Sequence, residues 1–189
     1  MKIFNSRLFR VLIVLFIFGF LLGIVSFIVI KDNSGIINYF ESLKNNDYIS
    51  FSSFISLLIS NYKYAFIIWI LGILFFLSII TPFIIIFRGI LVGFTISSII
   101  YSFHIKGLLY AFIMLFPCTI INELVFILLS FYSINFSFKL FNIFKNNKFI
   151  NIRSFTKNYF YIFLILLVTL LLSSLFETYI TSNIIRFMI

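Results

Sequence analysis

A single glutamate follows a proline and an asparagine in a stretch that is otherwise apolar enough to lie in lipid. Residues 114–126 read MLFPCTIINELVF and contain Pro117, Asn122 and Glu123. A charged carboxylate in hydrocarbon is costly, so Glu123 is expected to face a bundle interior, to be paired or to be protonated. It could form an ion- or proton-linked site, lock the register of two helices, or act as hydrogen-bonding glue between helices.

Few partners for Glu123 are available in the sequence. Asn122 is adjacent and so projects from a different helical face, while Ser130 lies two turns further on. Pro117 frees a carbonyl near residue 113. Arg88 would sit at the cytoplasmic membrane edge and would reach Glu123 only if the broken helix bends toward it.

The remaining residues offer little for catalysis. His104 is the only histidine, which excludes an H-E-x-x-H zinc helix and a Ser-His-Asp triad. Cys118 is the only cysteine, which excludes an intramolecular disulfide and a Cys-rich zinc site. We therefore expect no enzyme, no catalytic residue, no metal and no cofactor.

The composition places these residues in a membrane protein. Hydrophobic residues make up 63% of the 189 residues and charged residues only 10%, which is too little polar surface for a water-soluble globule. The formal net charge is +9, but the basic residues lie between apolar runs, as membrane topology requires, and nucleic acid is not expected as a partner.

The apolar runs predict a single all-α domain, residues 1–189, built as a polytopic bundle of about five transmembrane helices. A span needs roughly 20 apolar residues. The predicted spans are residues 11–30, 64–87, 89–103, 107–136 and 158–178, the fourth kinked or broken at Pro117. Residues 31–63 form an external loop, whose second half has the apolar spacing of an interfacial helix. Residues 137–157 form a basic cytoplasmic loop, expected to hold anionic lipid headgroups.

The basic residues predict a cytoplasmic N-terminus and an external C-terminus in the cell membrane. In this orientation most of the cations lie inside, namely Lys2, Arg7, Arg10, Arg88, Lys139, Lys145, Lys148, Arg153 and Lys157. Lys63 and Glu177 would lie outside.

Two glycine pairs could let helices approach closely. Gly19 and Gly23 lie four apart in the first span, and Gly89 and Gly93 do so in the third. The pairs indicate either packing within one chain or an intermolecular face, so a homo-oligomer stays open.

Several motifs resemble stage II sporulation protein M of endospore-forming Firmicutes, from about residue 61 to the end. They are WILG at 69–72, a [KR]GxxVGF pattern at 88–94, FP at 116–117, FSxKL at 136–140 and SSxxExY at 173–179, which includes Glu177. The chain departs from the family pattern near Pro117: Cys118 and Thr119 replace a His-Gly pair, and Asn122 holds the place of a glutamate.

The resemblance implies a non-enzymatic scaffold in the mother-cell membrane at the sporulation septum. In that family the protein brings together two peptidoglycan hydrolases, the stage II sporulation proteins D and P, for septal wall dissolution and forespore engulfment. Partners would dock on residues 31–63, on the 177–189 tail, or on the Gly89 and Gly93 face.

Two other interpretations stay open. One is a small transporter or permease subunit with Glu123 in an intramembrane polar site. The other is a membrane protein of the same superfamily without a role in sporulation.

Overall fold

The computed structural model describes residues 6–44, 51–74, 76–146 and 152–188, and this part of the chain is α-helical without strands. The all-α prediction is confirmed. Five of its helices are long and apolar enough to cross a membrane. The α-helices are α1 (Arg7–Ile30), α2 (Ser34–Lys44), α3 (Phe51–Ile73), α4 (Thr81–Met114), α5 (Ile120–Asn146), α6 (Ile152–Leu175) and α7 (Ser182–Met188). A 3₁₀ turn, η1 (Leu77–Ile80), and two π-helical segments, η2 (Leu115–Thr119) and η3 (Phe176–Thr181), join them.

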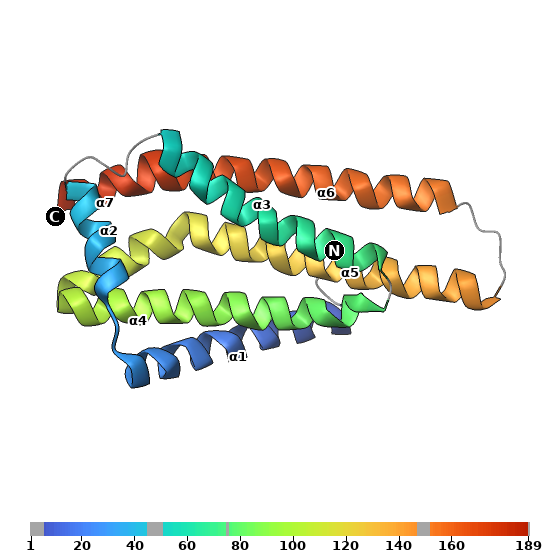
Figure 1. The fold of residues 1–189 in the computed structure, drawn as a ribbon, viewed down its shortest axis with the longest axis horizontal. Helices are drawn as coiled ribbons and strands as arrows, with labels where there is room; N and C mark the ends of the chain where they lie inside the picture. Colours follow the sequence, from blue (N-terminus) through green and yellow to red (C-terminus); the bar gives the residue numbers. More distant parts are fainter. Residues whose placement is uncertain (1–5, 45–50, 75, 147–151, 189) are drawn as a thin grey trace.

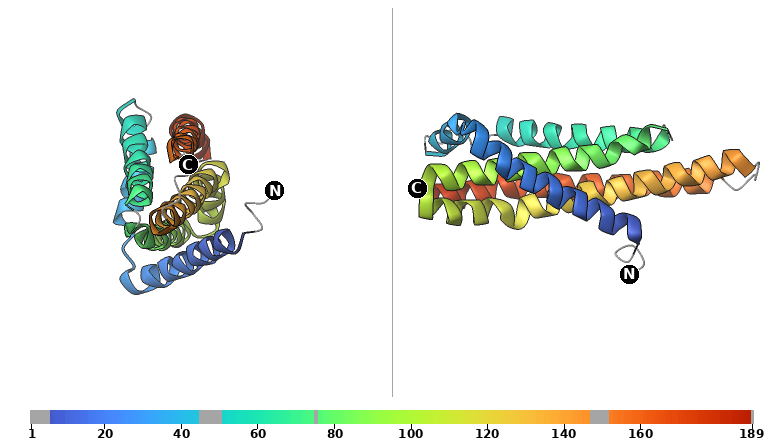
Figure 2. Two further views of the ribbon diagram at one scale, coloured as in Figure 1. Left: turned by 90° about the vertical axis from the view of Figure 1, so that its right-hand side faces the viewer. Right: turned by 90° about the horizontal axis from the view of Figure 1, so that it is seen from below.

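The long helices lie side by side in three layers (Figures 1 and 2). Helix α1 forms one layer and packs mainly on α4, while α3 and α6 form the opposite layer over α5. Helices α5 and α6 extend beyond the others where they join each other, and α2 and α7 lie at the opposite end (Figure 1). Which end is cytoplasmic stays a prediction.

The chain reverses inside α4. His104 has φ 50° and ψ −121°, a backbone conformation that no helix contains, and it divides α4 into two arms. Gly107 at the start of the second arm lies against the backbone of Ile99 and Ile100 in the first, so the arms are antiparallel. The predicted boundary between the third and fourth spans, at residues 104–106, matches this turn.

The boundary between the second and third spans was predicted wrongly. The helices separate near residues 74–80, not at Arg88, so that predicted span 64–87 contains the end of α3 and the start of α4. The missed signal is Pro82, which sits in the first turn of α4, where its missing N–H costs no hydrogen bond. Arg88 had been taken for a membrane edge, but it lies seven residues beyond the start of α4 at Thr81, about 10 Å along the helix.

The interfacial helix predicted for the second half of residues 31–63 does not form as a separate helix. Residues 51–63 belong to the membrane-spanning α3, and Lys63 lies exposed in its middle, away from the predicted external edge. Instead α2 crosses the end of the bundle (Figure 1). Its Phe40 ring packs against Phe103 at 4.3 Å and against Tyr110 at 5.2 Å between centroids. Residues 45–50 and 147–151 of the two predicted loops lie outside the described residues.

Asp32 organises the start of α2. Its carboxylate accepts hydrogen bonds from the Ser34 hydroxyl at 2.7 Å and from the Ser34 backbone N–H at 3.0 Å. These two bonds favour the charged form, and they hold the pKa of Asp32 below its usual value. The amide of Asn33 donates to Ser102 in the first arm of α4 at 3.2 Å, which ties the same turn to the bundle.

The two glycine pairs meet each other within the chain. A Cβ atom at Gly19 or Gly23 would collide with the backbone carbonyls of Ile86 or Ile90 in α4. Gly89 and Gly93 lie equally close to the backbone of α1. Helix α1 therefore covers the Gly89 and Gly93 face, and the idea that partners dock there was wrong.

We predict that Gly23→Ala lowers the stability of the protein by about 1–3 kcal/mol, because the added methyl group must separate two backbones in contact. Thermal unfolding in detergent micelles measures the effect. Gly35→Ala in α2 is the matched control: open space surrounds Gly35, and the substitution should leave stability unchanged or raise it by about 0.5–1 kcal/mol. Equal losses in the two variants would contradict the close α1–α4 packing.

We also predict that Phe40→Ala costs about 3–5 kcal/mol, because its ring is 4% exposed and fills the core beneath α2. Hydrogen exchange of α2 amides should accelerate more than that of α3 or α6. Phe51→Ala, at the 68%-exposed start of α3, should change little. Unchanged exchange in α2 would show that the helix is held by other contacts.

Candidate intramembrane polar site

Arg88 and Glu123 form an ion pair inside the bundle. The guanidinium Nη2 donates to Glu123 Oε1 at 2.6 Å, and the two side chains are only 13% and 5% exposed. The guanidinium also lies 4.3 Å from the ring centroid of Phe126 and 5.3 Å from that of Tyr64, where aromatic faces attract a cation. The pair lets two charges lie among apolar side chains.

The turn at His104 explains why these two residues meet. Arg88 lies 16 residues before His104, and Glu123 lies 17 residues after Lys106. In an antiparallel pair of helices, residues equally far from the turn reach the same level. The position of the turn at His104 is therefore enough to place Arg88 beside Glu123. The helix that carries Glu123 does not have to bend toward the membrane edge to reach Arg88.

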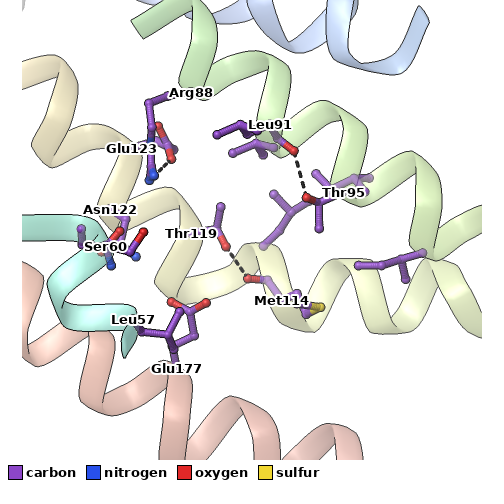
Figure 3. Close-up of a pocket in the computed structure, with 15 residues that line it drawn as sticks. Leu57, Ser60, Arg88, Leu91, Thr95, Met114, Thr119, Asn122, Glu123 and Glu177 are labelled. Carbon is purple, nitrogen blue, oxygen red and sulfur yellow. Dashed lines mark hydrogen bonds and ion pairs between the residues drawn. The ribbon is translucent and has the colours of Figure 1, made fainter. Parts of the chain in front are cut away.

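Two more of the predicted residues join the pair in one pocket of about 230 Å³, Asn122 and Glu177 (Figure 3). Glu177 had been assigned to the external segments, but it lies within the helical stretch Phe155–Phe187, which is long and apolar enough to cross a membrane, and it lines this pocket. The expectation that Glu177 lies outside was therefore wrong. Asn122 makes no hydrogen bond to Glu123, consistent with their different helical faces.

The two π segments place Glu177 beside the pocket. The Cys118 thiol of η2 lies 3.5 Å from the Thr181 hydroxyl of η3, and Ser173 donates to the Cys118 carbonyl at 3.2 Å. Each segment also has a side-chain bond to a carbonyl five residues back, from Thr119 to Met114 and from Ser182 to Glu177. A π segment contains an extra residue per turn, so it rotates the helix that follows it about its own axis. The two π segments therefore influence which side chains of η2, α5 and η3 face the pocket.

Pro117 belongs to η2, so the predicted break of the fourth span at this residue takes the form of a π segment. The carbonyls of Met114 and Cys118 in this region accept hydrogen bonds from the hydroxyls of Thr119 and Ser173, whereas the Glu123 carboxylate pairs with Arg88. Ser130, also considered as a partner of Glu123, has no hydrogen bond to it.

Sequence reasoning missed the wall that α3 contributes. Ser60 and Asn61 line the pocket, and the Asn61 amide donates to Ser174 at 3.4 Å. Because 51–63 had been assigned to a helix on the membrane surface, neither residue was considered. Asn61 is a buried polar residue in the otherwise apolar helix α3. If the second span is taken to begin near residue 51, a polar residue at this position predicts a side chain that faces the bundle interior.

The pocket lies in the half of the bundle nearest α2. Its wall runs along α4 from Arg88 to Ile99, which is five residues before the turn at His104. Helix α3 contacts α5 and α6 extensively but α4 much less. Ser60 and Leu91, on the facing sides of α3 and α4, are exposed, so the pocket opens between these two helices.

Tyr39 of α2 lies close to Glu177 from the outer side. Burial, opposed by a hydrogen bond with Ser182 and supported by the negative charge of Glu177, raises the pKa of the Tyr39 hydroxyl to about 12. Tyr39 is therefore neutral at physiological pH and supplies no charge to the site.

The fold and the pocket define a polytopic all-α membrane protein with a charged site inside its bundle. Residues 10–182 match the model of the family described as stage II sporulation protein M. The chain belongs to this family, and it is a sporulation-related membrane protein. No match was found among curated proteins or among solved structures.

We predict that Arg88→Met lowers stability by about 3–5 kcal/mol, because it leaves the Glu123 carboxylate buried without its cation. Adding Glu123→Leu should recover most of the loss. Thermal unfolding in micelles measures both variants, with Lys63→Met as the control that removes an exposed cation from α3. A double variant no more stable than Arg88→Met would contradict a simple charge pair.

Proposed function

We propose that the protein is a non-enzymatic membrane scaffold that recruits and localises peptidoglycan hydrolases at the sporulation septum. The observation that carries the proposal is the family match over residues 10–182, which includes nearly all of every described spanning helix. Following the resemblance, the hydrolases are the stage II sporulation proteins D and P, and the location is the mother-cell membrane. Septal wall dissolution and forespore engulfment are the processes it serves.

The α2 end of the bundle is the docking surface that we favour. Helix α2 and the C-terminal α7 lie together there, and both belong to segments expected to face the space where the hydrolases act. The α2 residues Ile37 and Glu41 are exposed beside the packed face that contains Phe40. A partner can therefore contact α2 without displacing it from the bundle.

The opposite end is suited to anionic lipid. Lys139 and Lys157 lie exposed on the extended ends of α5 and α6, and the Lys139 ammonium stacks 4.6 Å from the Phe155 ring centroid. Basic side chains near a membrane surface contribute about 1 kcal/mol each to binding of anionic lipid.

A transporter or permease subunit is the second candidate. The polar pocket around Arg88, Glu123 and Glu177 favours it, because transporters bind their substrates at polar sites between membrane helices. Under this hypothesis the pocket residues, and not the α2 surface, carry the function.

Deleting the gene in its native host and imaging septal membranes with a fluorescent dye during sporulation tests the scaffold. We expect septa that form but fail to curve around the forespore, and hydrolases tagged with a fluorescent protein that no longer concentrate at the septum. Normal engulfment and normal hydrolase localisation would refute the proposal.

Two rescue strains separate the candidate functions. The Arg88→Met/Glu123→Leu variant keeps the α2 surface and removes the charge pair, whereas Ile37→Asp/Glu41→Lys changes the α2 surface and keeps the pocket. With membrane levels matched by immunoblot, a scaffold predicts rescue by the first variant and failure of the second. The reverse result would favour the transporter.

A further inference from the structure

The polar pocket carries unequal numbers of acidic and basic groups. Its walls contribute two carboxylates, Glu123 and Glu177, and one guanidinium, Arg88. Arg88 makes its direct ion pair with Glu123, so Glu177, which the same guanidinium attracts only from a greater distance, has no ion pair of its own among the described residues. Tyr39 and Cys118, the other titratable groups close to Glu177, are not cations. A net negative charge in an apolar bundle is costly unless a cation or a proton compensates it.

Two buried oxygen atoms of the same pocket also lack a hydrogen bond to the described residues. They are Glu123 Oε2, on the side of the carboxylate that Arg88 does not occupy, and Asn122 Oδ1. Both residues are 4% exposed as a whole. Buried polar atoms are nearly always satisfied, so these two acceptors indicate that the site holds a cation or a hydrogen-bond donor. The Nε–H of Arg88 in the same pocket also lacks a partner among the described residues, which fits a water molecule accompanying such an ion.

The chemistry of these acceptors fits a small hard cation. Carboxylate and amide oxygens, with the hydroxyls of Ser60 and Thr119 in the same wall, are the ligands that such ions prefer. Nowhere in the described chain do three His, Cys, Asp or Glu side chains gather as a transition metal requires. A single uncompensated carboxylate matches a single positive charge. The pocket, about 230 Å³, has room for an ion with several water molecules, each of which occupies roughly 30 Å³ in the liquid.

We propose that the pocket between α3, α4, α5 and η3 binds one monovalent alkali cation of the sodium type, with Glu177 as its counter-charge and Asn122 and Glu123 as further oxygen ligands. The site extends beyond the scaffold role and does not depend on it, since a bound ion stabilises the bundle whether or not it is transported. It also departs from the expectation of no metal.

The proposal is tested by measuring the unfolding temperature of the purified full chain in detergent micelles at different sodium concentrations. Sodium chloride replaces choline chloride at constant total salt and neutral pH, so that ionic screening stays equal. We expect the unfolding temperature to rise saturably, by roughly 5 °C at sodium concentrations far above the dissociation constant. The wild-type protein in choline chloride alone should be the least stable sample.

Two variants with the same chemical change locate the site. Glu177→Gln removes the uncompensated charge, so it should unfold at a higher temperature than wild type in choline and lose the response to sodium. Glu41→Gln removes an exposed acid of α2 and should respond as wild type does. Because Glu177→Gln is expected to be stable, loss of folding does not obscure the result.

Three outcomes would overturn the proposal. One is a wild-type protein that no alkali cation stabilises more than choline. Another is a sodium response that Glu177→Gln retains. The third is stabilisation by acidification alone, lost in Glu177→Gln, which would show that a proton on Glu177 supplies the compensating charge. None of these results bears on hydrolase localisation, so a failed cation site and a failed scaffold are distinguishable.

Discussion

A charged residue in an apolar bundle must be enclosed with its counter-charge, and the Arg88–Glu123 pair imposes this constraint on the rest of the structure. The pair exists because α4 reverses at His104 and places α5 beside its first arm in antiparallel register. Aromatic rings of α3 and α5 then cover the guanidinium. Helices α3, α4 and α5 are therefore positioned relative to one another by one buried interaction as well as by apolar packing.

Adjacent residues of α4 contact two different parts of the structure, the polar pocket and helix α1. Arg88 points into the polar pocket, whereas Gly89 and Gly93 lie against the backbone of α1. In lipid, where the hydrophobic effect does not drive helices together, such close backbone contact is a main source of association. The glycine contact with α1 thus fixes the helix that carries the buried cation, and it links the packing of the N-terminal helix to the geometry of the pocket.

The bundle separates its polar chemistry from the surface that a partner would contact. Helix α2 covers the end of the bundle with Phe40 directed inward, while residues on its other side remain exposed. The pocket lies beneath this helix, and Tyr39 and Glu177 are close to each other at the boundary. A bound cation and a docked protein would therefore act on neighbouring parts of the same end, with α2 between them.

The sequence by itself determined the all-α membrane class, the family and the turn at residues 104–106, and it singled out Glu123 and Pro117 as unusual residues within an apolar stretch. These features follow from hydropathy, from ordered motifs and from single residues that are costly in lipid. Local sequence patterns led to a wrong prediction of the α3–α4 boundary. A lone arginine after an apolar run indicates the edge of a membrane span, unless it is known that the arginine has a buried acidic partner such as Glu123. Only the tertiary structure decided that Glu177, Asn122 and Asn61 share one pocket and that the glycine pairs meet each other. The reason is physical: these contacts join helices far apart in the chain, and π segments and antiparallel register set which faces meet.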